Sequence, residues 1–131
     1  MKKIQTIFLA IFVIVFLFSC STKLSHDEYY AKAKKAYTES KFKEAVENFK
    51  LLVEYYPDGE KTAEASFMLG FINANDLKDF AEAEKYYKAF IEKYPKHDLT
   101  DDAQYELKFL GKDINELPMF GNLGADSTDN E

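Results

Sequence analysis

The chain has 131 residues, 47% of them hydrophobic, and a formal net charge of −6, which suits one small domain with additional segments at its ends. All 17 basic residues are lysine, and they alternate with Asp and Glu instead of gathering in a patch. Because phosphate groups are usually bound by arginine forks and basic patches, this composition argues against a nucleic-acid-binding protein.

The N-terminus has the pattern of a bacterial export signal. Lys2 and Lys3 give a positive start, and residues 7–18 form an unbroken apolar run, "IFLAIFVIVFLF". A charged start before roughly 7–15 apolar residues is typical of a signal peptide, whereas a membrane-spanning helix needs about 20. We therefore expect residues 1–19 to be a signal peptide.

The apolar run ends at Cys20, the single cysteine of the chain. The sequence Leu17-Phe18-Ser19-Cys20 resembles the lipobox of bacterial lipoproteins, with an aliphatic residue three positions before the cysteine and a small one directly before it. The resemblance implies cleavage between Ser19 and Cys20, a diacylglyceryl group on the Cys20 thiol and a fatty acyl chain such as palmitate on the new amino group. Two or three such chains anchor a protein stably where one does not. An uncleaved signal anchor, or ordinary cleavage that leaves a free thiol, are the alternatives.

Residues 20–24 would then form a lipidated linker to the folded domain. Five helices are expected after it, at about 25–40, 41–56, 61–75, 79–94 and 100–110. Ser25 with Glu28 forms a capping box at the first helix, and Asp79 with Glu82 caps the fourth. The third helix is apolar nearly all round, which indicates packing on both sides. Residues that stop the second, fourth and fifth helices are Pro57, Pro95 and Gly111.

The helical segments repeat with a period of 38 residues. The segment "YPDGEKTAEASFMLGFI", from Tyr56, aligns with "YPKHDLTDDAQYELKFL", from Tyr94. Matching pairs are Pro57 and Pro95, Thr62 and Thr100, Ala65 and Ala103, Phe67 and Tyr105, Leu69 and Leu107, and Phe71 and Phe109. The chain therefore reads as two complete helix pairs and the first helix of a third.

The recurring positions resemble those of the tetratricopeptide repeat (TPR). In the order ring, small residue, ring, alanine, ring and proline, the first unit has Tyr29, Ala33, Phe42, Ala45, Phe49 and Pro57. The second unit matches at every position except that of the small residue, with Phe67, Phe80, Ala83, Tyr87 and Pro95. The resemblance covers residues 25–112 and implies an all-α, TPR-like α-solenoid of about five helices. A helical bundle without repeats is the alternative. Residues 113–131 are small, polar and acidic, and we expect them to be disordered.

The period of 38 exceeds the usual TPR period of about 34, and the added residues follow the proline of each unit. This longer connection, directly after a lipobox, resembles the BamD-type outer-membrane assembly lipoproteins. It is also similar to the repeats of the YbgF/CpoB family, the Tol–Pal coordinators, which carry a coiled coil that is not seen in this sequence. BamD-type proteins have about five repeats, so the resemblance implies a shortened relative or a generic lipoprotein of the same repeat class.

The TPR resemblance implies a concave face, built from the first helix of each unit, that binds a partner protein. The expected residues of this face are Tyr30, Lys34, Tyr37, Met68, Ile72, Asn75, Glu106 and Leu110. For Met68 and Ile72 the alternative is a place in the core. The last helix also presents Tyr105 and Phe109, which residues 117–120, a second copy of the chain or a partner protein would cover. We favour the partner.

No catalytic or metal-binding pattern is evident. His26 and His97 have no further ligand at metal-binding spacing, and the sequence has no Gly-rich phosphate loop. We therefore expect a protein that is not an enzyme and that has no cofactor apart from the lipid on Cys20.

Together these features predict a lipid-anchored scaffold of the bacterial envelope that assembles outer-membrane proteins. Its partners would be envelope proteins, the β-barrel assembly machinery among them, with a homo-oligomer left open. An adaptor for cell-wall enzymes or the Tol–Pal system, and a surface lipoprotein that binds an external ligand, are the alternatives. Ser21 after the cysteine is compatible with an outer-membrane lipoprotein that faces the periplasm; the inner membrane and the cell surface stay open.

Overall fold

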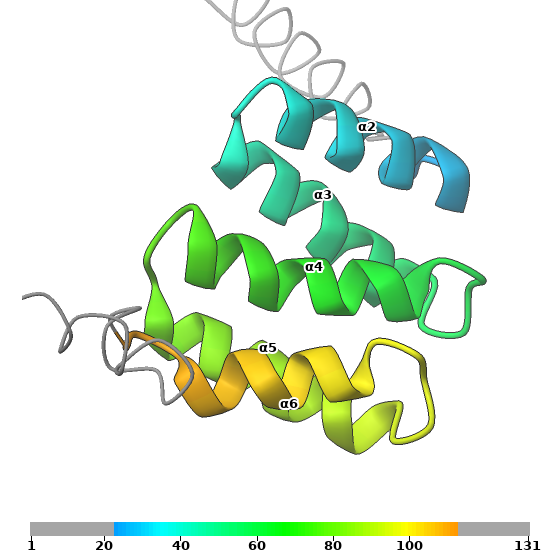
Figure 1. The fold of residues 1–131 in the computed structure, drawn as a ribbon. Coiled ribbons are helices and arrows are strands. Elements are labelled where there is room, and N and C mark those ends of the chain that lie inside the picture. Colours follow the sequence, from blue (N-terminus) through cyan, green and yellow to red (C-terminus); the bar gives the residue numbers. More distant parts are fainter. Residues whose placement is uncertain (1–22, 113–131) are drawn as a thin grey trace, which may run out of the picture.

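The computed structural model describes residues 23–112. Its helices are α2 (His26–Thr38), α3 (Phe42–Tyr55), α4 (Thr62–Asn75), α5 (Phe80–Lys93) and α6 (Thr100–Phe109) (Figure 1). No strand occurs in this part of the chain, so the predicted all-α fold is confirmed. The predicted signal peptide (1–19), Cys20 and the acidic tail (113–131) lie outside the described residues.

The helices form a stack in which each packs against the next along the chain, α2 on α3, α3 on α4, α4 on α5 and α5 on α6. Two short turns, at residues 39–41 and 76–79, lie at one edge of this stack, which we call the turn edge (Figure 1). Two longer connections, at residues 56–61 and 94–99, lie at the opposite edge, which we call the linker edge (Figure 1). This is the arrangement of a short helical solenoid.

Local signals set the helix ends as the sequence predicts. At the start of α2 the Glu28 N–H donates to the Ser25 hydroxyl (3.4 Å), while the Ser25 N–H donates to the Glu28 carboxylate (2.8 Å). At α5 the Asp79 carboxylate accepts the N–H of Glu82 (3.1 Å). Gly111 follows α6 with a φ of 74°, a conformation that glycine adopts without steric cost. These caps satisfy backbone groups that a helix end would otherwise leave unpaired.

The 38-residue repeat extends to the hydrogen bonds of the longer connections. In the first, the Tyr56 carbonyl oxygen accepts from the Gly59 N–H (3.0 Å) and from the Thr62 hydroxyl (2.6 Å). In the second, the acceptor is Tyr94 and the donors are His97 (3.1 Å) and Thr100 (2.6 Å). Both threonines are buried. The connection that lengthens each unit is thus a fixed, hydrogen-bonded structure, which gives the recurring threonine its role.

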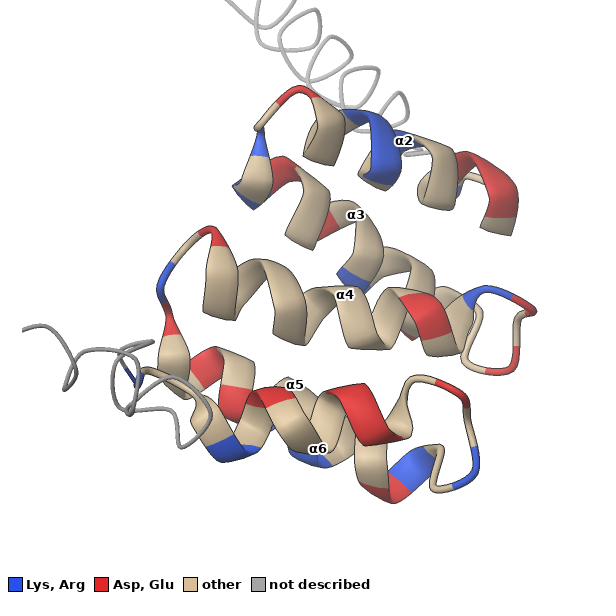
Figure 2. Ribbon diagram, in the orientation of Figure 1, with Lys and Arg blue, Asp and Glu red and all other residues tan. Residues whose placement is uncertain are grey.

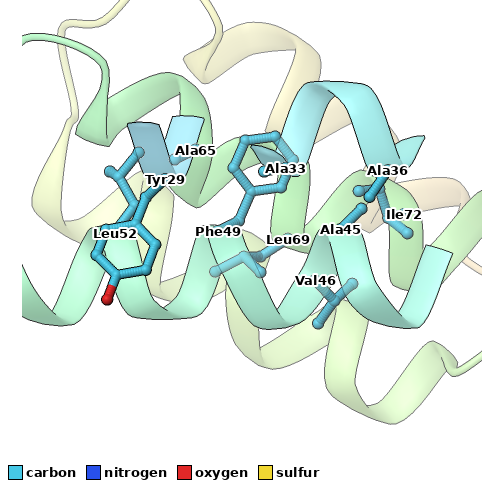
Figure 3. Packing of buried hydrophobic residues seen from close by; sticks show 10 residues of the cluster. All are labelled: Tyr29, Ala33, Ala36, Ala45, Val46, Phe49, Leu52, Ala65, Leu69 and Ile72. Carbon is cyan, nitrogen blue, oxygen red and sulfur yellow. The ribbon is translucent and has the colours of Figure 1, made fainter. Parts of the chain in front are cut away.

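Two buried clusters hold the stack together. The first joins α2, α3 and α4 through Tyr29, Ala33, Ala36, Ala45, Val46, Phe49, Leu52, Ala65, Leu69 and Ile72 (Figure 3). The second joins α4, α5 and α6 through Ala74, Ala83, Tyr87, Phe90 and Ala103. Helix α4 contributes to both clusters, and Glu64 is its only charged residue (Figure 2). The prediction that this helix is packed on both sides is therefore confirmed.

Gly70, in the middle of α4, lets α5 approach closely. A Cβ atom at this position would lie 2.7 Å from the ring of Tyr87, a side chain that is itself fully buried. Contacts this short do not occur between ordinary side chains. The absence of a side chain at Gly70 is therefore what allows the Tyr87 ring to fill the space between α4 and α5.

We expect Gly70→Ala to lower the free energy of unfolding by about 1–3 kcal/mol, because the added methyl group meets a ring that has no free space to move into. A Gly→Ala change in the interior of a helix ordinarily stabilises it by up to about 1 kcal/mol, so the sign of the effect is diagnostic. Urea unfolding of the two proteins measures it.

The double variant Gly70→Ala, Tyr87→Leu is the control, since contacting residues give non-additive effects. We expect it to lose less stability than the two single variants added together. A higher urea midpoint for Gly70→Ala would contradict this account of the helix crossing.

Candidate functional site

The structure separates the residues predicted for the concave face into three places: a polar bridge between α2 and α4, the core, and a groove at the turn edge. Tyr30 and Lys34 belong to the bridge. Tyr37, Met68 and Ile72 pack in or against the first core cluster. Asn75, Glu106 and Leu110 line the groove together with Tyr105 and Phe109.

The bridge centres on the carboxylate of Glu64. The Tyr30 hydroxyl donates to it (2.5 Å), and the Lys34 Nζ lies 3.7 Å from the same oxygen. The Lys61 Nζ lies 4.7 Å from the centre of the Tyr30 ring, within the range of a cation–π contact. Burial, together with the hydrogen bond to Glu64, raises the pKa of Tyr30 to about 12. Tyr30 is thus engaged within the domain, where it joins the first helices of two successive units.

The core placements correct one prediction. The side chain of Ile72 is 0% exposed, which leaves it no surface for a partner, so Ile72 is a core residue. Met68 and Tyr37 are half-buried and pack against the same cluster, and the Tyr37 ring lies edge-on to Phe42, with 5.8 Å between ring centres. Partner binding by Met68 and Tyr37 stays a prediction.

The groove lies at the turn edge, between the C-terminal ends of α4 and α6, and has a volume of about 370 Å³. Its principal apolar walls are Tyr105 and Phe109, whose ring centres are 4.7 Å apart, and Phe80. Tyr105 is 48% exposed and Phe80 41%. The remaining lining residues are Ala74, Asn75, Lys78, Glu106, Leu110, Gly111 and Lys112. The helix ends therefore bring exposed rings, an amide, a carboxylate and two ammonium groups to one place.

Phe80 and Lys78 were not predicted as site residues. Lys78 lies in the turn between α4 and α5, and Phe80 begins α5. The fold brings this turn beside the end of α6, which places both residues in the groove. The TPR pattern predicts only a packing role for the Phe80 ring.

The ring pair of α6 repeats one in α4. Phe67 and Phe71 stand 38 residues before Tyr105 and Phe109 and stack with 6.2 Å between ring centres. Helix α5 contacts that earlier pair, since Tyr87 and Phe90 each lie 5.8 Å from Phe67. No helix follows α6 within residues 23–112. The Tyr105–Phe109 surface is therefore the counterpart of one that a helix covers in the preceding unit.

Two electrostatic features lie beside the groove. Burial raises the pKa of Tyr87 above its usual range, and the nearby Glu106 carboxylate adds to the effect. Lys108 and Lys112 extend over the outer ring, with their Nζ atoms 5.3 and 5.4 Å from the centre of Phe109. The groove thus combines aromatic rings with polar and charged groups, a mixture that is common at protein-binding surfaces.

Nothing in residues 23–112 gathers three or more His, Cys, Asp or Glu side chains in a way that would hold a metal ion. Over the same residues, every helix is too short or too polar to cross a lipid bilayer.

Comparison with known protein families identifies a family for most of the described chain. The model of the YfiO family, described as an outer membrane lipoprotein, matches residues 22–111. The chain belongs to this family. The predicted resemblance to BamD-type TPR lipoproteins is thereby confirmed. No curated protein matches the chain.

Membership of the YfiO family, which is described as an outer membrane lipoprotein, supports a location in the cell envelope and a scaffold that is not an enzyme. The match spans all five helices, and with them the bridge and the groove. Both candidate surfaces are thus parts of the family domain.

The bridge gives the domain a pH dependence above neutrality. The Tyr30 pKa is about 12 in the folded protein against 10.0 ordinarily, so the folded state holds this proton more tightly than the unfolded state. The stability contributed by Tyr30 is therefore complete below pH 10 and is lost as the pH rises towards 12. We expect the stability advantage of the wild type over Tyr30→Phe to shrink by up to about 2 kcal/mol over this interval.

Urea unfolding of both proteins from pH 9 to 11.5 measures this difference in stability. The two proteins share all other titratable groups, so the contributions of those groups cancel. Glu64→Gln keeps an acceptor for the Tyr30 hydroxyl but removes the charge. We therefore expect a smaller stability difference between Glu64→Gln and the double variant Tyr30→Phe, Glu64→Gln. A difference that does not change with pH would contradict the assignment to Tyr30.

Proposed function

We propose that this YfiO-family protein is a lipid-anchored, non-catalytic scaffold that holds a segment of an outer-membrane assembly partner in the groove between α4 and α6. The observation that carries the proposal is the ring pair of exposed Tyr105 and half-buried Phe109, since α5 contacts Phe67, the counterpart of Tyr105 in α4. The chain's family is described as an outer membrane lipoprotein. This description favours a partner from the machinery that inserts β-barrel proteins.

Binding at the groove would follow the usual division between apolar centre and polar rim. Tyr105 and Phe109 supply aromatic area, and truncating such rings in an interface typically costs about 2 kcal/mol or more of binding free energy. Asn75 and Glu106 offer hydrogen-bonding groups, and Lys78 favours an acidic residue beside the apolar segment. The groove thus suits a short partner segment with one or two rings or aliphatic side chains and an acidic flank.

Lipidation of Cys20 would restrict the scaffold to the membrane in which its partners lie. A tethered binder meets its partner at a raised effective concentration, which increases occupancy without any new contact. The body of the protein is acidic overall, so its charge gives little attraction to an anionic leaflet. The acyl chains are accordingly proposed as the anchor, on the periplasmic side of the outer membrane.

The proposal is tested by cross-linking in the native host, followed by capture of the protein and mass spectrometry of what it carries. We expect a β-barrel insertase with its accessory lipoproteins. Recovery of cell-wall enzymes or Tol–Pal components without the insertase would overturn the assembly role in favour of an adaptor.

The variant Tyr105→Ser, Phe109→Ser tests the groove itself. We expect capture of the partner to fall about tenfold or more, because two rings leave the interface. The circular dichroism spectrum should keep its helical signal. Gln104→Ser is the matched control, since this exposed residue adjoins Tyr105 on α6 but is not part of the groove. Undiminished capture by the double variant would place the partner elsewhere.

A further inference from the structure

The chain enters the first helix pair through a fixed contact at the linker edge. The Lys23 Nζ lies 4.8 and 4.4 Å from the ring centres of Tyr55 and Tyr56, and it donates to the Tyr55 carbonyl oxygen (3.3 Å). The Tyr56 hydroxyl donates to the Leu24 carbonyl oxygen (2.8 Å). Leu24 packs against the first core cluster. We call this set the entry clamp; it holds the backbone from Lys23 onward against the end of α3.

The distance from the entry clamp to the lipid attachment point is short. Three residue steps separate Cys20 from Lys23, and a fully extended chain covers at most about 11 Å in that length. This step depends on the proposed lipidation of Cys20, which places that residue at the bilayer surface. Lys23 then lies close to the lipid headgroups whatever path residues 20–22 take.

The clamp also decides which edge of the solenoid is near the membrane. Tyr55 and Tyr56 end α3, at the start of the first longer connection, and Lys93 joins the neighbouring helix to it through its bond to the Pro57 carbonyl oxygen (3.0 Å). The groove lies at the other edge, beyond the length of α4 (Figure 1). A helix of 14 residues is about 21 Å long, so the two edges lie roughly that far apart.

We propose that the linker edge is a membrane-facing surface that rests on a zwitterionic headgroup layer, so that the groove opens away from the bilayer. The chemistry of the edge fits such a layer. Tyr55 is 40% exposed, and tyrosine and lysine are side chains that combine an apolar body with a polar end suited to the interface. Lys61 is already paired with Asp27 (3.5 Å), and the nearby Asp58 and Glu60 oppose attraction to an anionic surface.

This orientation gives the short anchor a function. A freely rotating domain would present its groove to the bilayer as often as to the periplasm, whereas the entry clamp fixes the direction. Partner segments at some distance from the membrane then meet an open groove.

The test uses the lipidated full-length mature protein, purified from host membranes and reconstituted in phosphatidylcholine vesicles that carry a headgroup-attached quencher. A thiol-reactive fluorophore is placed on Asp58→Cys, at the linker edge, or on Ser40→Cys, at the turn edge of the same helix pair. A lipidated Cys20 has no thiol to react. We expect quenching to be several-fold stronger for Asp58→Cys than for Ser40→Cys.

Equal quenching at the two positions, or stronger quenching for Ser40→Cys, would overturn the orientation. Opening the clamp with Lys23→Ala and Tyr56→Phe should bring the two values together while the protein still floats with the vesicles. An unchanged ratio in that variant would show that the clamp does not set the direction. A protein that fails to float and whose Cys20 takes the label would contradict the anchor itself, whereas a floating protein with equal quenching contradicts the orientation alone.

Discussion

The close crossing of the two helices within each pair is the constraint on which the rest of this structure depends. Helices approach closely only where side chains at the crossing are small, and here Gly70 leaves room for the fully buried ring of Tyr87. Ala33 and Ala45, both completely buried, have this place in the first pair beside Phe49 (Figure 3). The rings can then fill the space between successive helices, and two of them, Phe49 and Tyr87, are both fully buried and stand 38 residues apart.

Repetition also explains why similar residues stabilise the fold in one unit and form a surface in the next. Phe67 packs against α5, whereas its counterpart Tyr105 is exposed at the end of the described stack. A partly exposed ring pair at the end of a solenoid can bind another apolar segment, because in such a stack each repeat packs on its neighbour through this kind of face. The candidate binding site thus arises from where the repeat stops.

The two edges of the stack have different proposed roles, membrane contact at the linker edge and partner binding at the turn edge. The linker edge holds the entry clamp, three residues from the proposed lipid attachment at Cys20, while the turn edge holds the groove. The hydrogen bonds at Tyr56 and Tyr94 make the longer connections rigid, so the distance between the edges is set by the helices themselves. The proposed anchoring and the proposed binding would in this way be combined on one domain.

The sequence by itself determined the helices, their caps, the 38-residue period and the family, because these depend on local hydrogen bonds and on spacing along the chain. Ser25, Asp79 and Gly111 act as their patterns predict. Only the tertiary structure decided which side chains are accessible, since burial depends on which neighbouring helix covers each face. That is why Ile72, predicted for the binding face, proved to be core, and why the bond from Tyr30 to Glu64, 34 residues away, was not foreseen.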